Sequence, residues 1–393
     1  MGKPTIRFEG YTDDWEQRKV TDLGEIYIGL VTTMTEHYTD KGHLLIRNSD
    51  IKDGYFEFGE NPIYLDEEFS EQNKSRMHQL GDVITVHTGD IGTSAVIGEN
   101  EVNSIGFATI VTRPNQEILD SNYFATYLNT DTHKQWAISM ATGDGRSNYN
   151  LKDYTKLVVP IPEIEEQKKI ATCIVNLNSL ITLHHRKCEE TKKLKKFMLQ
   201  KMFPKKGEKV PDIRFEGFTD DWEQRKLDDV VEFLDTMRKP LEGAKRIPGP
   251  YPYYGASGIV DYVDGYLFDE ELILLSEDGA NITDRNYPVC FLASGKYWVN
   301  NHAHVLRTKQ ENENNFICNS LERKDYTQYN TGMAMPKLNK ETCKKIPISC
   351  PGFEEQKKVG DYFRSLDHLI TLHQHKCEEL QNIKKFMLQN MFT

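Results

Sequence analysis

Two long stretches of this chain, residues 163–203 and 352–392, carry a seam of mostly apolar side chains at alternating spacings of three and four. The seam positions are Ile170, Ile174, Leu177, Ile181, His184, Cys188, Thr191, Leu194 and Met198 in the first stretch, and Val359, Phe363, Leu366, Ile370, His373, Cys377, Leu380, Ile383 and Met387 in the second. Such spacing is typical of a coiled-coil helix. Each stretch therefore predicts a helix about 60 Å long that needs a partner along its seam.

The two stretches are also copies of each other. They align without a gap, and more than half of the aligned positions are identical. Two seams of equal length in one chain favour packing of the helices against each other, although each helix could instead pack against its own domain. We expect the two helices to pair as an antiparallel coiled coil, with His184 and His373 forming a polar layer that fixes the register.

A second, shorter repeat opens each half of the chain, at residues 6–19 and 213–226. Both copies contain the sequence FEG, one aromatic residue (Tyr11 or Phe218), and then TDDWEQRK. The spacing of Asp13 and Glu16, which recurs in the second copy, predicts a capping box for a short helix that carries the tryptophan of each leader.

The stretches between leader and long helix, about 27–160 and 234–349, resemble each other little. Both mix short β-rich runs with Gly and Asn turns, which predicts an α/β domain in each half. The predicted elements are a strand, Gly-rich loop and strand at 80–98, a helix within 121–140, a strand entering a Gly loop at 271–282, a strand at 297–307, and extended segments at 156–163 and 344–352 that lead into the long helices.

The predicted fold is therefore α+β, with two α/β domains separated by two long helices and related by a pseudo-twofold internal repeat. The expected division is 1–162 for the leader and first domain, 163–204 for the central helix, 205–351 for the linker, second leader and second domain, and 352–393 for the C-terminal helix.

Composition adds limits on the partners. A net charge of −11 argues against general nucleic-acid affinity, which needs Lys and Arg for phosphate contacts. The charge is uneven, however, because Arg186–Lys209 is strongly basic, so DNA is not excluded. No apolar run is long enough to span a bilayer, and the N-terminus has no signal-peptide core. Seven cysteines without a CxxC motif fit a cytosolic protein with no membrane partner.

A search for catalytic motifs finds no convincing site. Residues 61–64 (NPIY) are similar to the NPPY motif of amino-methyltransferases, but the second proline and a preceding glycine fingerprint are missing, so a turn is favoured. Residues 166–168 (EQK) have the spacing of some nucleases, yet they lie at a helix start, where capping explains them. His302 and His304 flank one residue on a predicted strand but lack a third ligand. We expect neither a catalytic nor a metal site in this chain.

Architecture is more informative than motifs. Two dissimilar domains attached to two near-identical helices suit a ligand with a repeat, and paired readers of DNA contact half-sites about one helical turn apart. Because the domains differ, the half-sites should differ and the target should not be a palindrome. The alternative is a duplicated coiled-coil scaffold whose globular domains bind proteins.

The doubled leader, the EEQKK entry to each long helix and the doubled ITLHxxKCEE…KKFMLQxMF helix resemble the specificity subunit of type I restriction–modification enzymes over essentially the whole chain. The resemblance implies two target recognition domains, each reading one half of a bipartite sequence in double-stranded DNA, with the helices as a ruler for the spacer. It implies no catalysis and no cofactor in this chain.

The resemblance also implies partners. Two modification subunits would bind S-adenosylmethionine and methylate adenine, and optionally two restriction subunits would use ATP and Mg²⁺ and cut DNA. Helix faces that include Lys168, Lys169, Lys357 and Lys358 are candidates for holding the modification subunits.

Candidate DNA contacts rest on side-chain chemistry. Arg can bridge guanine, Asn or Gln can bridge adenine, and glycine-rich loops allow close approach to the duplex. The candidates in the first domain are Thr88, Thr93, Ser94, Arg146, Ser147, Asn148 and Tyr149. The candidates in the second domain are Tyr254, Ser257, Asn281, Arg285, Asn301, His302 and Lys337.

Overall fold

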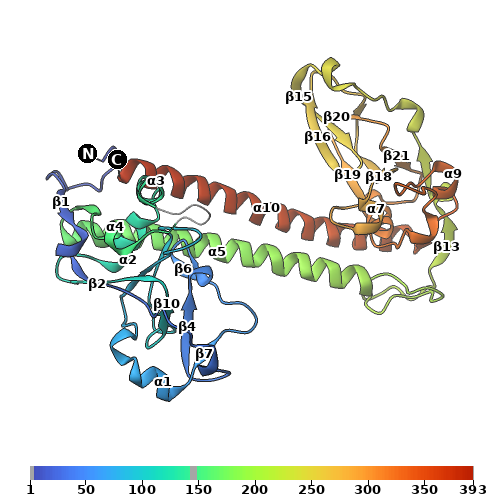
Figure 1. The fold of residues 1–393 in the computed structure, drawn as a ribbon. Coiled ribbons are helices and arrows are strands. Elements are labelled where there is room, and N and C mark those ends of the chain that lie inside the picture. Colours follow the sequence, from blue (N-terminus) through green and yellow to red (C-terminus); the bar gives the residue numbers. More distant parts are fainter. Residues whose placement is uncertain (1–3, 142–147, 393) are drawn as a thin grey trace. The chain divides into compact units, whose positions relative to one another are not determined.

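The computed structural model describes residues 4–141 and 148–392. The chain divides into two compact units, and the first of them is built from two separate stretches of sequence. The first unit comprises residues 1–185 and 375–393, and the second unit comprises residues 186–374. Each unit therefore contains the start of one long helix and the end of the other, since the helices are α5 (Ile164–Lys201) and α10 (Phe353–Met391) (Figure 1).

Within each unit the two helix segments pack in opposite chain directions. In the first unit, Cys173 Sγ lies 3.9 Å from Met387 Sδ, and Cys377 Sγ lies 3.6 Å from the Ile181 carbonyl oxygen. The numbers rise along α5 as they fall along α10, which is the antiparallel arrangement. In the second unit, Cys188 Sγ lies 3.9 Å from the carbonyl oxygen of Ile370. The cysteines at matching seam positions are thus packing residues, and within the described residues no cysteine forms a disulfide.

The predicted seam is wrong near the end of each helix. Leu194 is 43% exposed and the equivalent Ile383 is 39% exposed. Lys195 and Lys384 are more buried, and their ammonium groups pair with Asp367 at 2.5 Å and with Asp53 at 3.1 Å. An α-helix with 3.6 residues per turn drifts relative to a strict 3.5-residue repeat, so the inward position moves by one residue towards the helix end.

The first unit has two four-stranded sheets. The antiparallel sheet has the order β2 (Gly24–Ile28), β11 (Ile110–Pro114), β8 (Val83–Thr85) and β9 (Ser94–Val96). The mixed sheet has the order β10 (Ile105–Phe107), β4 (His43–Arg47), β7 (Tyr64–Leu65) and β3 (Tyr38–Thr39). The first unit also contains the hairpin of β5 (Ile51–Lys52) and β6 (Tyr55–Phe56), and helices α1 (Glu67–Gln72), α2 (Ser121–Leu128), α3 (Asp131–Met140) and α4 (Leu151–Tyr154).

The second unit also has two four-stranded sheets. The antiparallel sheet has the order β14 (Val231–Phe233), β21 (Ala303–Thr308), β18 (Leu272–Ser276) and β19 (Cys290–Ala293). The other sheet has the order β16 (Gly258–Val263), β15 (Pro248–Gly255), β20 (Lys296–Val299) and β17 (Phe268–Asp269). The short helices are α6 (Leu227–Val230), α7 (Asn281–Asp284), α8 (Asn314–Glu322) and α9 (Lys340–Cys343). The single strand predicted at 297–307 is in fact β20 and β21, which belong to different sheets.

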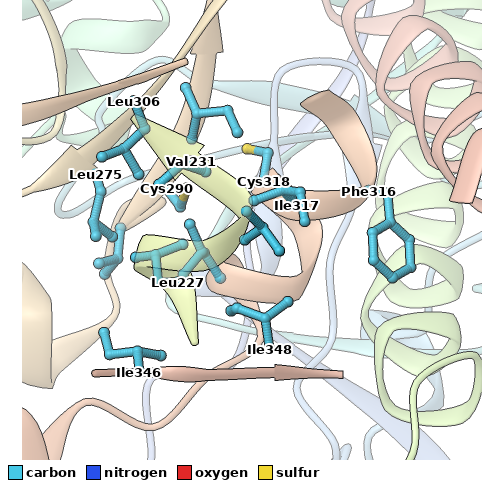
Figure 2. Close-up of a cluster of buried hydrophobic side chains, with 14 of the residues drawn as sticks. Leu227, Val231, Leu275, Cys290, Leu306, Phe316, Ile317, Cys318, Ile346 and Ile348 are labelled. Atoms are coloured by element: carbon cyan, nitrogen blue, oxygen red, sulfur yellow. The ribbon is translucent and has the colours of Figure 1, made fainter. Parts of the chain in front are cut away.

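The antiparallel sheets of the two units have the same topology, although their sequences differ. The order β2-β11-β8-β9 matches β14-β21-β18-β19, because in both sheets the strands that come first, fourth, second and third along the chain lie side by side in that sequence. In the second unit, β18 is buried along its whole length, and Figure 2 shows its Leu275 beside Leu306 in a core that also contains Phe316 of α8 and Ile348. The central strand of each sheet is thus fixed by burial, and the loop that follows it starts from a rigid base.

Both leaders are strands and not the predicted helices. β1 (Glu16–Lys19) pairs with β12 (Val158–Ile161), and β13 (Glu223–Lys226) pairs with β22 (Pro347–Cys350). The extended segment before each long helix offers a row of backbone hydrogen bonds, and this tertiary pairing overrides the local capping pattern.

The leader tryptophans pack on the ends of the long helices. Trp15 lies 6.0 Å from Phe392 and 6.3 Å from Tyr123 between ring centroids. Trp222 lies 5.9 Å from Phe203, which precedes the linker. In the described residues, no helix has the length and apolar character that a membrane span requires.

Candidate nucleic-acid interface

In the first unit, two loops meet at the end of β8. The loop that follows β8 runs through His87 and Thr88, and it pairs with the segment before α4. The amide of Tyr149 donates to the His87 carbonyl oxygen at 2.9 Å, and Thr88 and Asn148 form an isolated β-bridge. Residues 60 positions apart in sequence are therefore brought side by side.

A chain of side-chain hydrogen bonds joins these loops. The Thr88 hydroxyl donates to Asn148 Oδ1 at 2.8 Å, and Nδ1 of His87 lies 2.7 Å from the same hydroxyl oxygen. Because the hydroxyl proton is used on Asn148, Nδ1–H of His87 is the donor in the second bond. The amide of His87 donates to Asn48 Oδ1 at 2.7 Å. Burial lowers the pKa of His87, so its imidazole is neutral at pH 7, and Nε2 is an acceptor.

Three of the candidates in the first unit are interior residues. Thr93, Ser94 and Tyr149 are all buried. The Thr93 hydroxyl donates to Asp90 Oδ2 at 2.8 Å, and the backbone of Ser94 exchanges two hydrogen bonds with the Asn129 side chain at 3.0 and 2.8 Å. These residues hold the loop in place and do not present a side chain to a ligand, which corrects their assignment as contacts. Arg146 and Ser147 lie outside the described residues.

The second unit builds the same pair of loops. The amide of Leu338 donates to the Glu277 carbonyl oxygen at 2.7 Å, and Asp278 and Lys337 form an isolated β-bridge. These contacts are equivalent to those of Tyr149 with His87 and of Asn148 with Thr88. Lys337 is exposed, and its ammonium group lies 3.3 Å from a Glu277 carboxylate oxygen.

The loop before β21 joins this pair. The amide of Glu277 donates to the carbonyl oxygen of His302 at 2.9 Å, and the imidazole Nδ1 of His302 lies 2.8 Å from Asp278 Oδ1. Both His302 and Asn301 are exposed. Thus His302, Asn301 and Lys337, which the sequence suggested separately, lie in adjoining loops.

A buried polar network supports these loops from below. His304 is buried, with Nδ1 2.8 Å from Asp235 Oδ2 and Nε2 2.7 Å from the Leu338 carbonyl oxygen. Burial alone would raise the pKa of Asp235, but the hydrogen bond from His304 and the charges of His304 and Arg238 lower it. Arg238 Nη1 lies 2.6 Å from Glu277 Oε2. The position of the loop after β18 is therefore fixed by paired charges.

The other candidates of the second unit lie away from this pair of loops or are already engaged. The side-chain Nδ2 of Asn281 donates to the Pro288 carbonyl oxygen, and its Oδ1 accepts from the amide of Tyr287. The Arg285 guanidinium pairs with Glu322 at 3.0 Å. Tyr254 is half-buried against Tyr297, with ring centroids 5.6 Å apart. Ser257 is exposed in the turn between β15 and β16.

Sequence reasoning missed His87 and Asn48 in the first unit and Glu277 and Asp278 in the second. His87 and Asp278 directly neighbour residues or loops that were singled out, so the strand-then-glycine pattern carried a signal for them. Asn48 carried no such signal, because its role depends on a contact with a segment 39 residues away.

The two pairs of loops offer different chemistry. The first unit presents a hydroxyl, an amide and a neutral imidazole, whereas the second presents an ammonium, an imidazole and two carboxylates. Amides and imidazole acceptors suit adenine, lysine suits guanine, and carboxylates accept from the amino group of cytosine. Equivalent positions on the same scaffold therefore carry different hydrogen-bond donors and acceptors.

Comparison with known proteins also shows a repeat, because one family model matches the chain twice. The model of the family described as type I restriction modification DNA specificity domain matches residues 12–193 and 219–382. A putative type I restriction enzyme specificity subunit from Haemophilus influenzae is 35% identical over 157 residues, which cover 40% of this chain and 39% of that protein. The putative type I restriction enzyme MjaX specificity subunit from Methanocaldococcus jannaschii is 25% identical, covering 97% of this chain and 93% of the relative.

A solved structure shares the fold. The S subunit of a type I restriction–modification system from M. genitalium matches with a TM-score of 0.72 and 15% identity, covering 100% of this chain and 99% of that chain.

Proposed function

Since the chain belongs to the type I restriction–modification DNA specificity family, and so serves DNA sequence recognition, we propose that each unit reads one half of an asymmetric bipartite target. The observation that carries the proposal is the repeated pair of loops. Thr88 with Asn148 and Asp278 with Lys337 occupy equivalent bridges on sheets of the same strand order, yet they differ in chemistry. Two units with the same strand order but different side chains at the equivalent bridges suit two different half-sites.

In this proposal the long helices set the unread spacer. Its support is that α5 and α10 each have residues in both units without a break in the helix. The chain supplies recognition, whereas S-adenosylmethionine, ATP and Mg²⁺ act on the partner subunits. In the described residues, no group of three His, Cys, Asp or Glu side chains is placed to hold a metal ion.

The proposed partners are two modification subunits and, where cleavage occurs, two restriction subunits. The support is a second duplication, in the exposed apolar residues of the helices. Leu180 and Leu183 are exposed, and so are their equivalents Leu369 and Leu372. Phe197 and its equivalent Phe386 are exposed as well. Apolar side chains that stay exposed at equivalent positions of both repeats fit two copies of the same partner.

The number of partners is tested by native mass spectrometry of the complex with its modification subunit. We expect two modification subunits per chain. Leu180→Asp and Leu369→Asp should each remove one copy and leave the other bound. Loss of both copies from either single variant, or of neither, would contradict two equivalent docking faces.

The reading of DNA is tested by mapping methylated adenines in genomic DNA exposed to that complex. We expect a two-part, non-palindromic consensus. Replacing residues 27–160 with the corresponding domain of a relative should change one half of the consensus only. Insertion of one heptad within 170–198 should change the spacer while both halves stay the same, and a changed half-site would contradict the role of the helices.

The same experiment separates the rival function, a scaffold whose domains bind only proteins. A scaffold would assemble with the modification subunit but give no sequence consensus, and exchange of residues 27–160 would not redirect methylation.

A further inference from the structure

The loop of residues 330–337 in the second unit carries two exposed methionines at its tip. Met333 is fully exposed, and Met335 is 60% exposed. Only Ala334 separates them. Large apolar side chains normally lie inside a folded domain, so two of them together at a loop tip indicate a surface that another molecule covers.

Hydrogen bonds close the neck of this loop, where residues 330–332 meet Lys337. Asn330 Oδ1 accepts from the amides of Gly332 and Lys337, both at 2.9 Å. The amide of Thr331 donates to the Lys337 carbonyl oxygen at 2.8 Å, and its hydroxyl donates to the same oxygen at 3.0 Å. The backbone of the tip is thus organised before any ligand arrives, which reduces the entropic cost of binding.

Glycine is required at the neck. A Cβ at Gly332 would lie 1.8 Å from the carbonyl oxygen of Met335, closer than any two such atoms can approach. Any side chain at Gly332 must therefore push the two arms of the loop apart. This gives a way to disturb the tip without removing either methionine.

The loop is also docked on the candidate interface. The amide of Gly279 donates to the Pro336 carbonyl oxygen at 3.0 Å, and Lys337 forms the bridge with Asp278. The apolar tip therefore adjoins the exposed polar groups of Lys337 and His302. In the first repeat, the sequence at the corresponding place, residues 142–147 (TGDGRS), is polar, so this feature belongs to one repeat only.

We propose that Met333 and Met335 form a wedge that enters the DNA duplex at the half-site read by the second unit and unstacks one base step. The proposal rests on the proposed function of DNA recognition. Proteins that distort DNA insert apolar side chains, including methionine, between base pairs, and they hold the neighbouring backbone with polar groups. Methionine suits this role because its flexible thioether adapts to an irregular gap.

An unstacked step has a use in this reaction. A base must leave the stack before an enzyme can modify it, and the energy of unstacking is part of the cost. A wedge carried by the recognition chain lowers that cost at the second half-site.

The test uses the complex of the full chain with its modification subunit, and duplexes in which 2-aminopurine replaces one base at a time across the mapped second half-site. We expect the fluorescence of 2-aminopurine to rise on binding at one step. The double variant Met333→Ala with Met335→Ala should abolish that rise and weaken binding on the order of tenfold. Replacement of both methionines by leucine should keep the rise, whereas replacement by glutamine, which has similar length, should lose it. Gly332→Ala should also lose the rise, with both methionines present.

A duplex with a mismatch at the same step supplies the decisive control. Because the mismatch removes most of the stacking, the alanine variant should bind it nearly as well as the wild-type chain does. No fluorescence change with the wild-type chain, or a binding loss that the mismatch does not restore, would overturn the wedge. Failure of the variant to assemble with the modification subunit in the absence of DNA would also overturn it, because the tip would then be a protein contact. If sequence-specific binding persists while these results fail, only the wedge is refuted. If no sequence is recognised at all, the proposed function fails.

Discussion

Arg7 and Glu166 form a two-point ion pair that joins the N-terminal leader to the first turn of α5. Nε donates to Oε1 at 2.7 Å and Nη2 donates to Oε2 at 2.8 Å, and the carboxylate is fully buried. Arg214 and Glu355 repeat the pair with the same distances in the second unit. Glu166 therefore anchors the leader through Arg7, in addition to interacting with the helix dipole.

Replacement of this carboxylate should destabilise the first unit. We expect Glu166→Ala to lower its free energy of unfolding by about 3 kcal/mol, because the Arg7 guanidinium loses its partner at a largely buried site. The neighbouring Glu165 pairs with Lys168 at an exposed site, so Glu165→Ala should cost about 0.5 kcal/mol or less. Urea unfolding of the two variants measures the difference, and equal losses would contradict the buried role.

Stability of the first unit should fall on acidification. Burial lowers the pKa of His133 to about 4, and burial together with the Arg113 charge lowers the pKa of His78 to about 3. In the unfolded chain both histidines are protonated near pH 6.5, whereas in the folded unit they stay neutral. The stability present above pH 6.5 is therefore lost as the pH falls towards 4. The loss at pH 5 is on the order of 2 kcal/mol for each histidine.

Urea unfolding at pH 7 and pH 5 checks this pH dependence. His133→Gln should be less sensitive to pH than the wild-type chain, whatever its stability at pH 7. An unchanged difference between the two pH values would show that His133 is not the group responsible.

The Thr88 hydroxyl should matter for one half of the target only. Thr88→Val leaves His87 and Asn148 without their shared partner, so both side chains lose their fixed positions. We expect affinity for DNA to fall about tenfold, with relaxed base preference confined to the half-site of the first unit. Thr88→Ser keeps the hydroxyl and should behave like the wild-type chain. Relaxation of the other half-site would place this loop elsewhere in the complex.

Two glycines of the same loop provide a matched pair. Gly89 (φ +105°) and Gly92 (φ +84°) both have left-handed backbones, but a Cβ at Gly89 meets open space, whereas one at Gly92 lies 3.2 Å from the His133 ring. Gly89→Ala should cost about 1 kcal/mol from strain alone. Gly92→Ala should cost about 1 kcal/mol more, because the packed histidine must move. Thermal unfolding compares the two variants.

The long helices could be predicted from sequence because their signal is local and repeated. Ile170 and Ile174 lie at the spacing that defines the seam, and both are buried. Leu194 could not be placed correctly, because the drift of the seam accumulates along the helix. The sequence around Trp15 predicts a helix because it matches a capping box, and the strand partner that decides otherwise lies more than 140 residues away.

The candidate interface was only partly predictable. The glycine loop at Thr88 and the segment at Asn148 each have a recognisable composition, but their pairing is a tertiary contact. Ser94 shows the limit of residue chemistry, because a hydroxyl that suits a base edge serves equally well to bond the Gly92 carbonyl oxygen in the interior. The repeat of strand order in domains of unlike sequence was invisible, since it depends on backbone pairing and burial.

The contact of Trp15 with Phe392 implies that a gene fragment could encode a working reader. Phe203 ends the first long helix just as Phe392 ends the second, and it already packs against the tryptophan of the other leader. A polypeptide of residues 1–204 thus carries both a leader and the helix end that a leader requires. Two such polypeptides should exchange helix ends, form a homodimer by light scattering and, with the modification subunit, methylate an inverted repeat of the first half-site.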